Sequence, residues 1–395
     1  MTLTKLGKIL SLGFPFEVLN RDLKLIFVSN LAGSFGDGLY AYLLPYYVAE
    51  TLKASPVEIG ALYAVVGLVA ALTLLVAGTL ADKYDRKKIM IVGWVAWMPA
   101  PIIFSIAGNW IQVLPGMVLW GVWLGGPTGT AYIVTAADKT RLASTFTAIS
   151  SAWSFGYIFS PALGGYLAGT NSMRIVFYMA FALYALAGFI LTFISSQHAI
   201  GYSQHSSEEG YSFFKLLRTR KLLELSIFFA SMMFILMLFR PFVPKFLADM
   251  YHYNDFEIGI LGSVCFFSSA VLGILLGRLG DKWRKTYALA VSMILCCVSL
   301  VLLVLFGNFP ILVLTFFITG GSYVTWSLMS AIIGPLAPES IRARWVSVPQ
   351  TVSMFSSVIA PYIGGVLYEF SPYYPFFAGM GVTFFLALLA FVKQF

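Results

Sequence analysis

Asp37 and Arg240 are the two charged residues that fall clearly inside the long apolar runs of this sequence. A charge inside an apolar helix is costly, so it usually has a functional role. Burial favours the neutral form of a carboxyl group, whereas a nearby guanidinium favours the anion. A carboxylate balanced in this way could take up and release a proton as its surroundings change. The alternatives are a static ion pair with Arg240, or a carboxylate bonded to the backbone near Gly36 and Gly38.

The apolar runs have the length of membrane-spanning helices. Of the 395 residues, 59% are hydrophobic and 11% are charged, whereas about a quarter of the residues in a soluble protein are charged. A helix needs about 20 mostly apolar residues to cross a bilayer. The sequence therefore predicts an all-α integral membrane protein with twelve transmembrane helices, at 23–48, 57–81, 88–107, 111–135, 142–168, 174–195, 222–247, 257–279, 286–306, 310–335, 346–368 and 373–393.

A long polar break divides these helices into two sets of six. We expect residues 1–195 to form one six-helix bundle, residues 196–221 a cytoplasmic linker, and residues 222–395 a second bundle.

The basic residues gather at one end of the predicted helices. The exceptions are Lys53, Arg174, Arg240 and Lys245. Because Lys and Arg concentrate in cytoplasmic loops, both termini are expected on the cytoplasmic side of a plasma membrane. The basic residues, which give a net charge of +8, then set the orientation of the chain in the membrane and contact anionic lipid headgroups. This charge gives no reason to expect a nucleic-acid partner.

The two sets of helices repeat each other at an offset of 199 residues. Glu58-Ile-Gly60 matches Glu257-Ile-Gly259, and Pro45 matches Pro244. An even number of helices in each half keeps both copies in the same membrane orientation. The halves are therefore related by an axis along the membrane normal, the parallel arrangement found in one large class of transporters.

A charged turn follows the second helix and returns after the eighth. The first copy runs from Gly78 through Asp82 to Arg86, and the second from Gly277 through Asp281 to Arg284. Together with the twelve helices and the repeat, the first copy resembles the G-x-L-a-D-r-x-G-r-k motif of the major facilitator superfamily. The resemblance covers nearly the whole chain, although Asp85 replaces the second glycine of the motif. A basic loop that only sets topology would explain the lysines but not Gly78 and Asp82.

The resemblance implies a cytoplasmic gate made of Gly78, Asp82, Arg86, Gly277, Asp281 and Arg284. In this family the aspartate of the first turn faces the start of helix 11, here near residues 345–347, where free N–H groups attract negative charge. The second turn is expected to face the start of helix 5, near residues 142–144. These contacts would hold the cytoplasmic side shut.

Helix 5 carries a second motif, Gly156-x-x-x-Ser160-Pro161-x-x-Gly164-Gly165. It resembles the G-x-x-x-G-P-x-x-G-G motif of exporters in the family, with a serine in place of one glycine. Proline removes a helix hydrogen bond, and glycine permits bending and close packing. Helix 11 contains a similar Pro361-x-x-Gly364-Gly365. The alternative is that any crowded pair of helices needs small residues.

Helices 1, 4, 7 and 10 line the central cavity in this family, which implies a substrate site among their aromatic residues. The candidates are Tyr40, Trp120, Trp123, Tyr132, Tyr323 and Trp326. Aromatic side chains suit amphipathic, aromatic or cationic substrates, although they also form interface belts and ordinary packing. Helix 4 has no arginine, which many proton-coupled antiporters of the family carry there.

These observations predict a monomeric secondary transporter without cofactor or metal that moves two bundles around a central site. The expected function is efflux of small hydrophobic or amphipathic compounds, driven by proton exchange through Asp37 with Arg240. The alternatives are uptake of a small polar solute such as a sugar or organic acid, and a transport-inactive membrane sensor or lipid-handling protein. The sequence has no G-x-x-x-x-G-K-[ST] motif for an ATP-driven pump. It also shows neither an enzyme's nucleophile–base pair nor cysteine spacing for a metal.

Overall fold

The structure is a computed structural model that describes residues 19–138, 141–198, 218–333, 336 and 342–392. All regular secondary structure among these residues is helical, as predicted. Residues 1–18 and 199–217, which include most of the predicted linker, lie outside the described part of the chain.

Each half of the chain forms six spanning segments. The N-terminal half consists of α2 (Arg21–Tyr40) with α3 (Leu44–Glu50), α4 (Pro56–Lys83), α5 (Arg86–Trp97) with α6 (Pro99–Ile106), η2 (Trp110–Val113) and α7 (Leu114–Trp120) with α8 (Gly125–Ala136), α9 (Leu142–Thr170), and α10 (Met173–Leu191). The C-terminal half consists of α12 (Arg220–Phe239) with η4 (Arg240–Phe242) and α13 (Val243–Tyr251), α14 (Asp255–Lys282), α15 (Lys285–Leu305), α16 (Phe309–Thr319) with η5 (Gly320–Val324) and α17 (Thr325–Ile333), α18 (Arg342–Phe370), and α19 (Tyr374–Val392).

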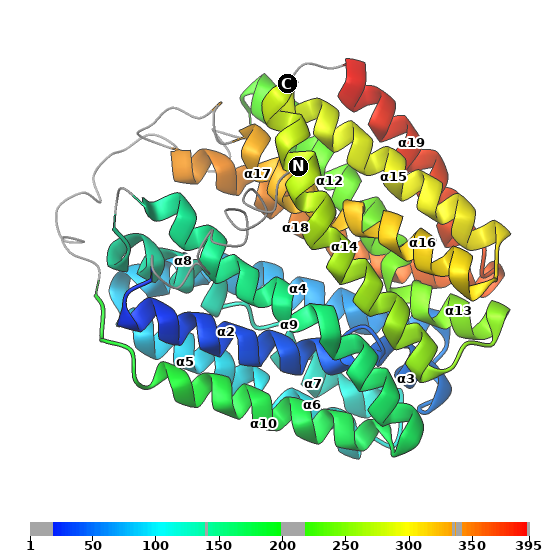
Figure 1. Ribbon diagram of the computed structural model, residues 1–395, viewed down its shortest axis with the longest axis horizontal. Coiled ribbons are helices and arrows are strands. Elements are labelled where there is room, and N and C mark those ends of the chain that lie inside the picture. Colours follow the sequence, from blue (N-terminus) through cyan, green and yellow to red (C-terminus); the bar gives the residue numbers. More distant parts are fainter. Residues whose placement is uncertain (1–18, 139–140, 199–217, 334–335, 337–341, 393–395) are drawn as a thin grey trace, which may run out of the picture.

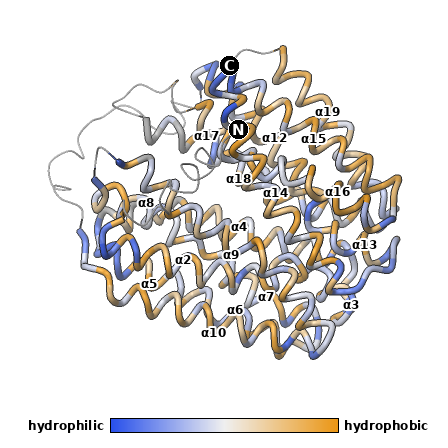
Figure 2. Tube along the Cα trace, in the orientation of Figure 1, coloured by the Kyte–Doolittle hydropathy of each residue, from blue (hydrophilic) through white to orange (hydrophobic). Residues whose placement is uncertain are grey.

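The two halves form two groups of helices that lie side by side (Figure 1). They meet near α3 and α13 and diverge toward α8 and α17. Hydrophilic residues gather at the helix ends, and hydrophobic residues cover most of the helix lengths (Figure 2). We call the end that carries Arg86, Arg220 and Lys285 the basic end, and the opposite end the far end. The halves therefore diverge at the basic end and meet at the far end.

The repeated Glu-Ile-Gly sequences begin equivalent helices at the far end. Ser55 caps α4 and Asn254 caps α14, and each cap accepts a hydrogen bond from the backbone N–H of the glutamate three residues later. The side chains of Glu58 and Glu257 bond back to the N–H groups of these caps at 2.7 and 3.0 Å. Both helices thus start with a capping box, which satisfies N–H groups that have no partner within the helix. This explains why both copies of the repeat place glutamate there.

Among the described residues, nine helical segments are long and apolar enough to cross a membrane by length and composition. The other three spanning segments are α2 with α3, α7 with α8, and α9. α7 with α8 and α9 are rich in Ser, Thr and Gly, and α2 with α3 carries charged residues, which lowers their hydropathy. These three segments supply most of the polar side chains of the site described below, so their lower hydropathy follows from the side chains that they carry.

Two crossing pairs of helices join the halves, α4 with α18 and α9 with α14. At each crossing, glycines of one half lie against carbonyl groups of the other: Gly60 on Pro361, Gly365 on Pro56, Gly259 on Pro161, and Gly165 on Asp255. A Cβ atom at these positions would overlap the facing backbone. The crossings therefore depend on residues without side chains, and they lie toward the far end, where the halves meet.

Candidate functional site

The first and fourth segments of each half are broken near their middle. The breaks lie at residues 41–43, 121–124, 240–242 and 320–324. They recur at the offset of the sequence repeat, so both halves share them. Backbone interrupted at membrane depth is tolerated where it is buried in protein or lines a cavity. In transporters built from internal repeats, such breaks mark binding sites.

Side chains bond the backbone that is freed at residues 121–124. The indole Nε1 of Trp97 donates to the carbonyl oxygen of Val122 at 2.6 Å, and Thr73 Oγ1 accepts from the N–H of Trp123 at 2.9 Å. These bonds replace helical partners in a region that lacks water, and they fix the geometry of the break.

Asp37 lies in the last turn of α2, just before the first break, and only 4% of the residue is exposed. Its Oδ1 accepts hydrogen bonds from Trp120 Nε1 at 2.8 Å and from the hydroxyl of Tyr184 at 2.5 Å. Its Oδ2 accepts from the hydroxyl of Tyr157. The hydroxyl of Tyr40 lies 2.9 Å from that of Tyr184 and extends the network. Three donors thus stabilise the carboxylate directly, because bonds to an ionised acceptor are stronger than neutral ones.

A cavity of about 200 Å³ lies within the N-terminal half, between α2, α5, α8 and α9. Its aromatic walls are Trp94, Trp97, Trp123 and Trp153. Its polar lining includes Asn30, Thr130 and Ser150. Gly125 and Gly126 begin α8 at the cavity, and a Cβ atom on Gly125 would meet open space. A mostly aromatic cavity with a few polar groups is suited to a small organic ligand.

The cavity tryptophans pack against two tyrosines that hold Asp37. Trp97 lies 5.9 Å from Tyr184 between ring centroids, and Trp153 stacks on Tyr157 at 6.4 Å. Both tyrosines donate to Asp37. A ligand that displaces these tryptophans would therefore act on the residues that hold the carboxylate.

Arg240 begins the break of the seventh segment and contacts the break of the tenth. Its Nη2 donates to the carbonyl oxygen and to the Oγ of Ser322 at 3.0 and 3.1 Å. Its guanidinium lies 4.1 Å from the ring centroid of Tyr323, a cation–π contact. Both charged residues of the membrane interior thus join two broken segments within their own half.

Asp37 and Arg240 form no ion pair within 4.0 Å in this structure. Aromatic rings connect them instead: Tyr157 lies 4.6 Å from Phe266, and Phe266 lies 5.3 Å from Tyr323. Phe266 belongs to α14 of the C-terminal half, so this row of rings crosses between the halves. Pairing of the two charges stays a prediction for another conformation of the chain.

The remaining aromatic candidates take different places. Trp120 bonds Asp37, Trp123 lines the cavity, and Tyr40 is fully buried beside Trp120. Tyr132 lies toward the basic end, where its hydroxyl is 2.9 Å from both Asp22 Oδ2 and the carbonyl oxygen of Ser195. Trp326 lies in α17, partly buried against the hydrophobic core.

The first charged turn binds the segment that follows α10. Arg86 is buried, and its Nη1 donates to Thr135 Oγ1 and Gln197 Oε1, both at 2.8 Å. Asp85, which replaces the glycine of the motif, caps α5 by accepting from the N–H of Lys87, and it also accepts from the N–H of Gln197. Burial opposes the charge of Asp85, but these hydrogen bonds hold the pKa of its carboxyl group below its ordinary value.

The other gate candidates do not form a visible latch. Asp281 and Arg284 are exposed at the basic end, and the guanidinium of Arg284 lies 5.7 Å from the ring of Tyr287. Gly277 lies in α14 with open space beside it. Gly78 and Asp82 lie in α4, but the Asp82 side chain is outside the described atoms, as are the side chains of residues 342–344. The predicted contact between the first turn and helix 11 stays a prediction.

The glycines of helices 5 and 11 pack against other helices. Gly156 and Gly164 of α9 lie on α2, against Ser34 and the carbonyl group of Leu39, and Gly364 of α18 lies on the carbonyl group of Leu238. Gly165 and Gly365 lie against the opposite half. The carbonyl groups of Pro161 and Pro361 are in turn contacted by glycines of the opposite half. In each Gly-Gly pair, therefore, the first glycine packs within its own half and the second against the other half. The predicted bending of these helices stays a prediction.

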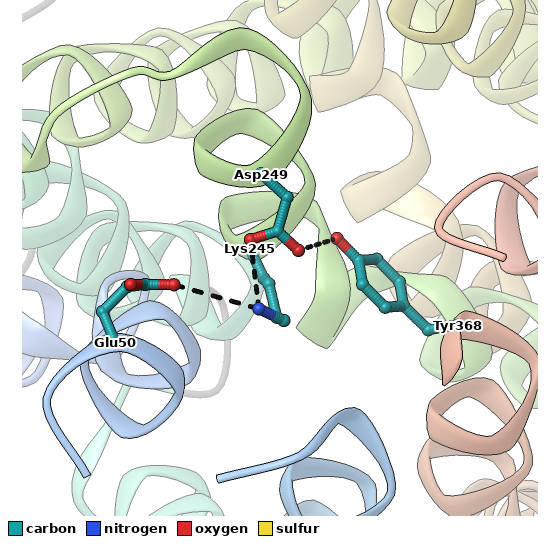
Figure 3. A network of polar contacts seen from close by, with 4 residues as sticks. All are labelled: Glu50, Lys245, Asp249 and Tyr368. Carbon is teal, nitrogen blue, oxygen red and sulfur yellow. Dashed lines mark hydrogen bonds and ion pairs between the residues drawn. The ribbon is translucent and has the colours of Figure 1, made fainter. Parts of the chain in front are cut away.

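An ion-pair cluster joins the halves at the far end (Figure 3). Lys245 Nζ lies 3.9 Å from Glu50 Oε1 of the N-terminal half and 3.1 Å from Asp249 Oδ1 of its own helix. Tyr368 donates to Asp249 Oδ2 at 2.8 Å and brings α18 into the cluster. In Figure 3 these side chains converge from α3, α13 and α18. The sequence analysis treated Lys245 only as an exception to the charge asymmetry.

Sequence reasoning missed most partners of the site. Tyr157, Tyr184 and Phe266 lie in apolar helices, where an aromatic residue is ordinary. Trp94, Trp97 and Trp153 belong to helices 3 and 5, which are not among the helices that the family resemblance places at the central cavity. Two neighbouring tryptophans, Trp94 and Trp97, on one face of a helix were the one available signal.

Comparisons with known proteins agree with this arrangement. The sequence model described as "Major Facilitator Superfamily" matches residues 26–254 and 225–394. The chain is 24% identical over 381 residues to Multidrug resistance protein 2 of Bacillus subtilis, covering 90% of this chain and 91% of the relative. It is 25% identical over 382 residues to Quinolone resistance protein NorA of Staphylococcus aureus, covering 92% and 94%.

Solved structures share the fold. A mutant of the nucleoside transporter NupG has a TM-score of 0.80 at 16% identity, covering 94% of this chain and 99% of that one. A POT family transporter in complex with 5-aminolevulinic acid has a TM-score of 0.77 at 14% identity, covering 94% and 96%. At these identities the likeness concerns the arrangement of helices alone.

Proposed function

The chain belongs to the major facilitator superfamily, and on that premise we propose that it exports small aromatic or amphipathic compounds in exchange for protons. As a member of the family it is a multi-pass membrane protein and a secondary transporter rather than an enzyme. Our proposal adds to this family membership a class of substrate, a direction of transport and a coupling ion.

One observation carries the proposal: the tyrosines that hold the carboxylate of Asp37 pack against the tryptophans that line the cavity. Tyr157 and Tyr184 each donate to the carboxylate and contact a cavity tryptophan. Protonation of Asp37 removes the charge that orients these donors, so the walls of the cavity change with its charge. Conversely, a ligand that shifts the tryptophans changes the stabilisation of the carboxylate. This is the reciprocal coupling that an exchanger of protons and substrate needs.

The arrangement of the halves is compatible with the proposed direction of transport, which is export. We assign the basic end to the cytoplasm, because basic residues concentrate there, and the far end to the outside. With the halves joined at the far end by the glycine crossings and by Lys245 with Glu50, this conformation faces inward. A substrate then enters from the cytoplasm or the inner leaflet and leaves after the far end opens and Asp37 takes up an external proton. The resistance functions named for both curated relatives support export.

Reconstituted protein tests the proposal. Liposomes that contain the transporter are loaded with a fluorescent aromatic dye, and a pH gradient of either sign is imposed. We expect dye movement to reverse when the gradient reverses and to be matched by counter-movement of protons. Dye flux that is indifferent to both gradients would contradict proton exchange.

The same liposomes separate export from uptake of a polar solute. A sugar or organic acid that enters together with protons, with no dye movement, would support the uptake alternative instead. We favour export because the cavity is lined mostly by apolar side chains and glycines, four tryptophans among them, which offer few hydrogen bonds to a polar solute.

A further inference from the structure

Arg240 is a cation without an anionic partner. The ion pairs among the described residues are Arg220–Glu224, Lys245–Glu50 and Lys245–Asp249, and Arg240 takes part in none of them. Its Nη2 bonds only the neutral oxygens of Ser322, and its buried Nε has no hydrogen-bond partner among the described residues. A charge inside the membrane region is normally balanced by an opposite charge. This site therefore lacks a negative group.

Asp37 does not supply that group in this conformation. Its two carboxylate oxygens already accept from Trp120, Tyr184 and Tyr157. The rings of Tyr157, Phe266 and Tyr323 connect the two charges in sequence. Arg240 is therefore still open to an acceptor at its Nε.

Aromatic side chains flank the cation. The guanidinium lies over Tyr323 at 4.1 Å, and Phe266 lies 5.3 Å from the same ring. Arg240 and Phe266 are both only partly buried, so parts of both residues still face open space. A planar guanidinium beside aromatic rings is matched by a ligand that has a carboxylate on an aromatic body, because arginine binds carboxylates with directed N–H bonds while the rings stack.

We propose that Arg240, Tyr323 and Phe266 form a subsite for the carboxylate end of an aromatic substrate. The proposal rests on the proposed function, because it names the class of compound that this transporter carries. The ligand carboxylate supplies the negative charge and the acceptor that the buried guanidinium lacks. The aromatic body lies along Phe266, the ring that crosses between the halves. The subsite thus prefers anionic or zwitterionic aromatic compounds to neutral or purely cationic ones of the same size.

Equilibrium binding without any proton gradient tests the proposal, so its failure is distinguishable from failure of proton exchange. Purified transporter in lipid nanodiscs is titrated with 1-naphthoate, methyl 1-naphthoate and 1-naphthylmethylammonium, which share one ring system. We expect naphthoate to bind about tenfold more tightly than the ester, as befits one charge-assisted contact. Arg240→Gln should abolish that preference, because it weakens naphthoate binding by about tenfold more than it weakens ester binding. Arg240→Lys should retain only part of it, because lysine lacks the planar fork.

The matched control is Arg220→Gln on the same segment, whose side chain is 94% exposed, and it should leave all three affinities unchanged.

The wild-type preference is itself a test, so the proposal stays falsifiable if Arg240→Gln does not fold. Equal binding of acid and ester by the wild type would overturn the proposal, and so would tightest binding of the ammonium. If Arg240→Gln weakens the binding of all three probes equally, Arg240 only stabilises the helix break and does not bind the carboxylate. If acetate displaces naphthoate at equal concentration, the aromatic part of the subsite is wrong.

Discussion

At the scale of single residues, the account depends on side chains that set the shape of one cavity and the charge of one carboxylate. Trp120, Tyr157 and Tyr184 hold Asp37, and the tryptophans behind two of these donors form the cavity. Because an indole or phenol has two rotatable bonds, these walls form a stiff surface at low entropic cost. Glycines at the start of α8 keep the interior empty.

Filling the cavity should weaken binding without unfolding the chain. Gly125 lines the cavity, and a Cβ atom there meets open space, so Gly125→Leu places a side chain where the substrate is proposed to lie. We expect roughly tenfold weaker binding of an aromatic dye, the loss of about one good apolar contact. Thermal unfolding should change little. The control is Gly381→Leu on α19, which also meets open space but lies outside the cavity, and unchanged dye binding by Gly125→Leu would place the substrate elsewhere.

At the scale of elements, equivalent pieces of the two halves do different work. The capping boxes that start α4 and α14 and the glycines of α9 and α18 build a nearly symmetric far end. At the basic end Arg86 and its repeat partner Lys285 donate to the carbonyl groups of Ala131 and Ala331, but Asp85, which bonds Gln197, corresponds to the exposed Arg284. The first charged turn acts here as a clamp within the N-terminal half, joining α4, α8 and the segment after α10.

The clamp makes stability depend on pH. The pKa of Asp85 is lowered in the folded state, so its contribution to the free energy of unfolding is present above about pH 4, the ordinary range for an aspartate. The contribution is lost as the pH falls below that value. Asp85→Asn should lower the free energy of unfolding by about 1 kcal/mol at pH 7, roughly the difference between hydrogen bonds to a charged and to a neutral acceptor. Thermal unfolding at several pH values should show the gap between the variant and the wild type closing toward pH 3, and a gap that stays constant would contradict the assigned ionisation.

The far-end cluster should restrain opening only weakly. The pair of Glu50 with Lys245 is long, and the side chain of Glu50 is 44% exposed, so solvent screens much of the attraction. Glu50→Gln should raise the open population of the far end by roughly two- to fivefold. Hydrogen exchange at residues 51–55 and 252–254 measures this opening, and added salt should shrink the difference. Glu224→Gln, which breaks a pair within one helix, is the control, and equal exchange in both variants would remove Glu50 from the gate.

At the scale of the whole molecule, the repeat organises both fold and site. The two halves share four broken segments, yet one half places a carboxylate beside its breaks and the other a guanidinium. We infer that duplication of one half produced the shared arrangement of broken segments. Later divergence of the two sequences placed a negative side chain beside the breaks of one half and a positive side chain beside those of the other. The glycine crossings allow the halves to meet at the far end while they diverge at the basic end (Figure 1).

Much of this frame could be predicted from the sequence because length and hydropathy are local properties. The twelve segments and the repeat follow from apolar runs and from matches at a single offset. The breaks were harder, because apolar residues continue through them, although Pro45, Gly121, Pro241 and Gly320 stand at or beside them. The donors to Asp37 lie 83, 120 and 147 residues away along the chain. No spacing rule joins residues so far apart, so only the packed helices reveal that Tyr157 and Tyr184 belong to the site.

The central claim is that Asp37 couples proton movement to export, and Asp37→Asn tests it most directly. Two fluxes are compared in liposomes that contain equal amounts of wild type or variant. One is dye movement driven by an imposed pH gradient, and the other is exchange of labelled for unlabelled dye without a gradient. The account predicts that the variant loses gradient-driven movement almost completely while exchange persists, because asparagine keeps the size of the side chain and one of its two acceptor oxygens but cannot take up a proton. Gradient-driven movement by Asp37→Asn at the wild-type rate would contradict the account.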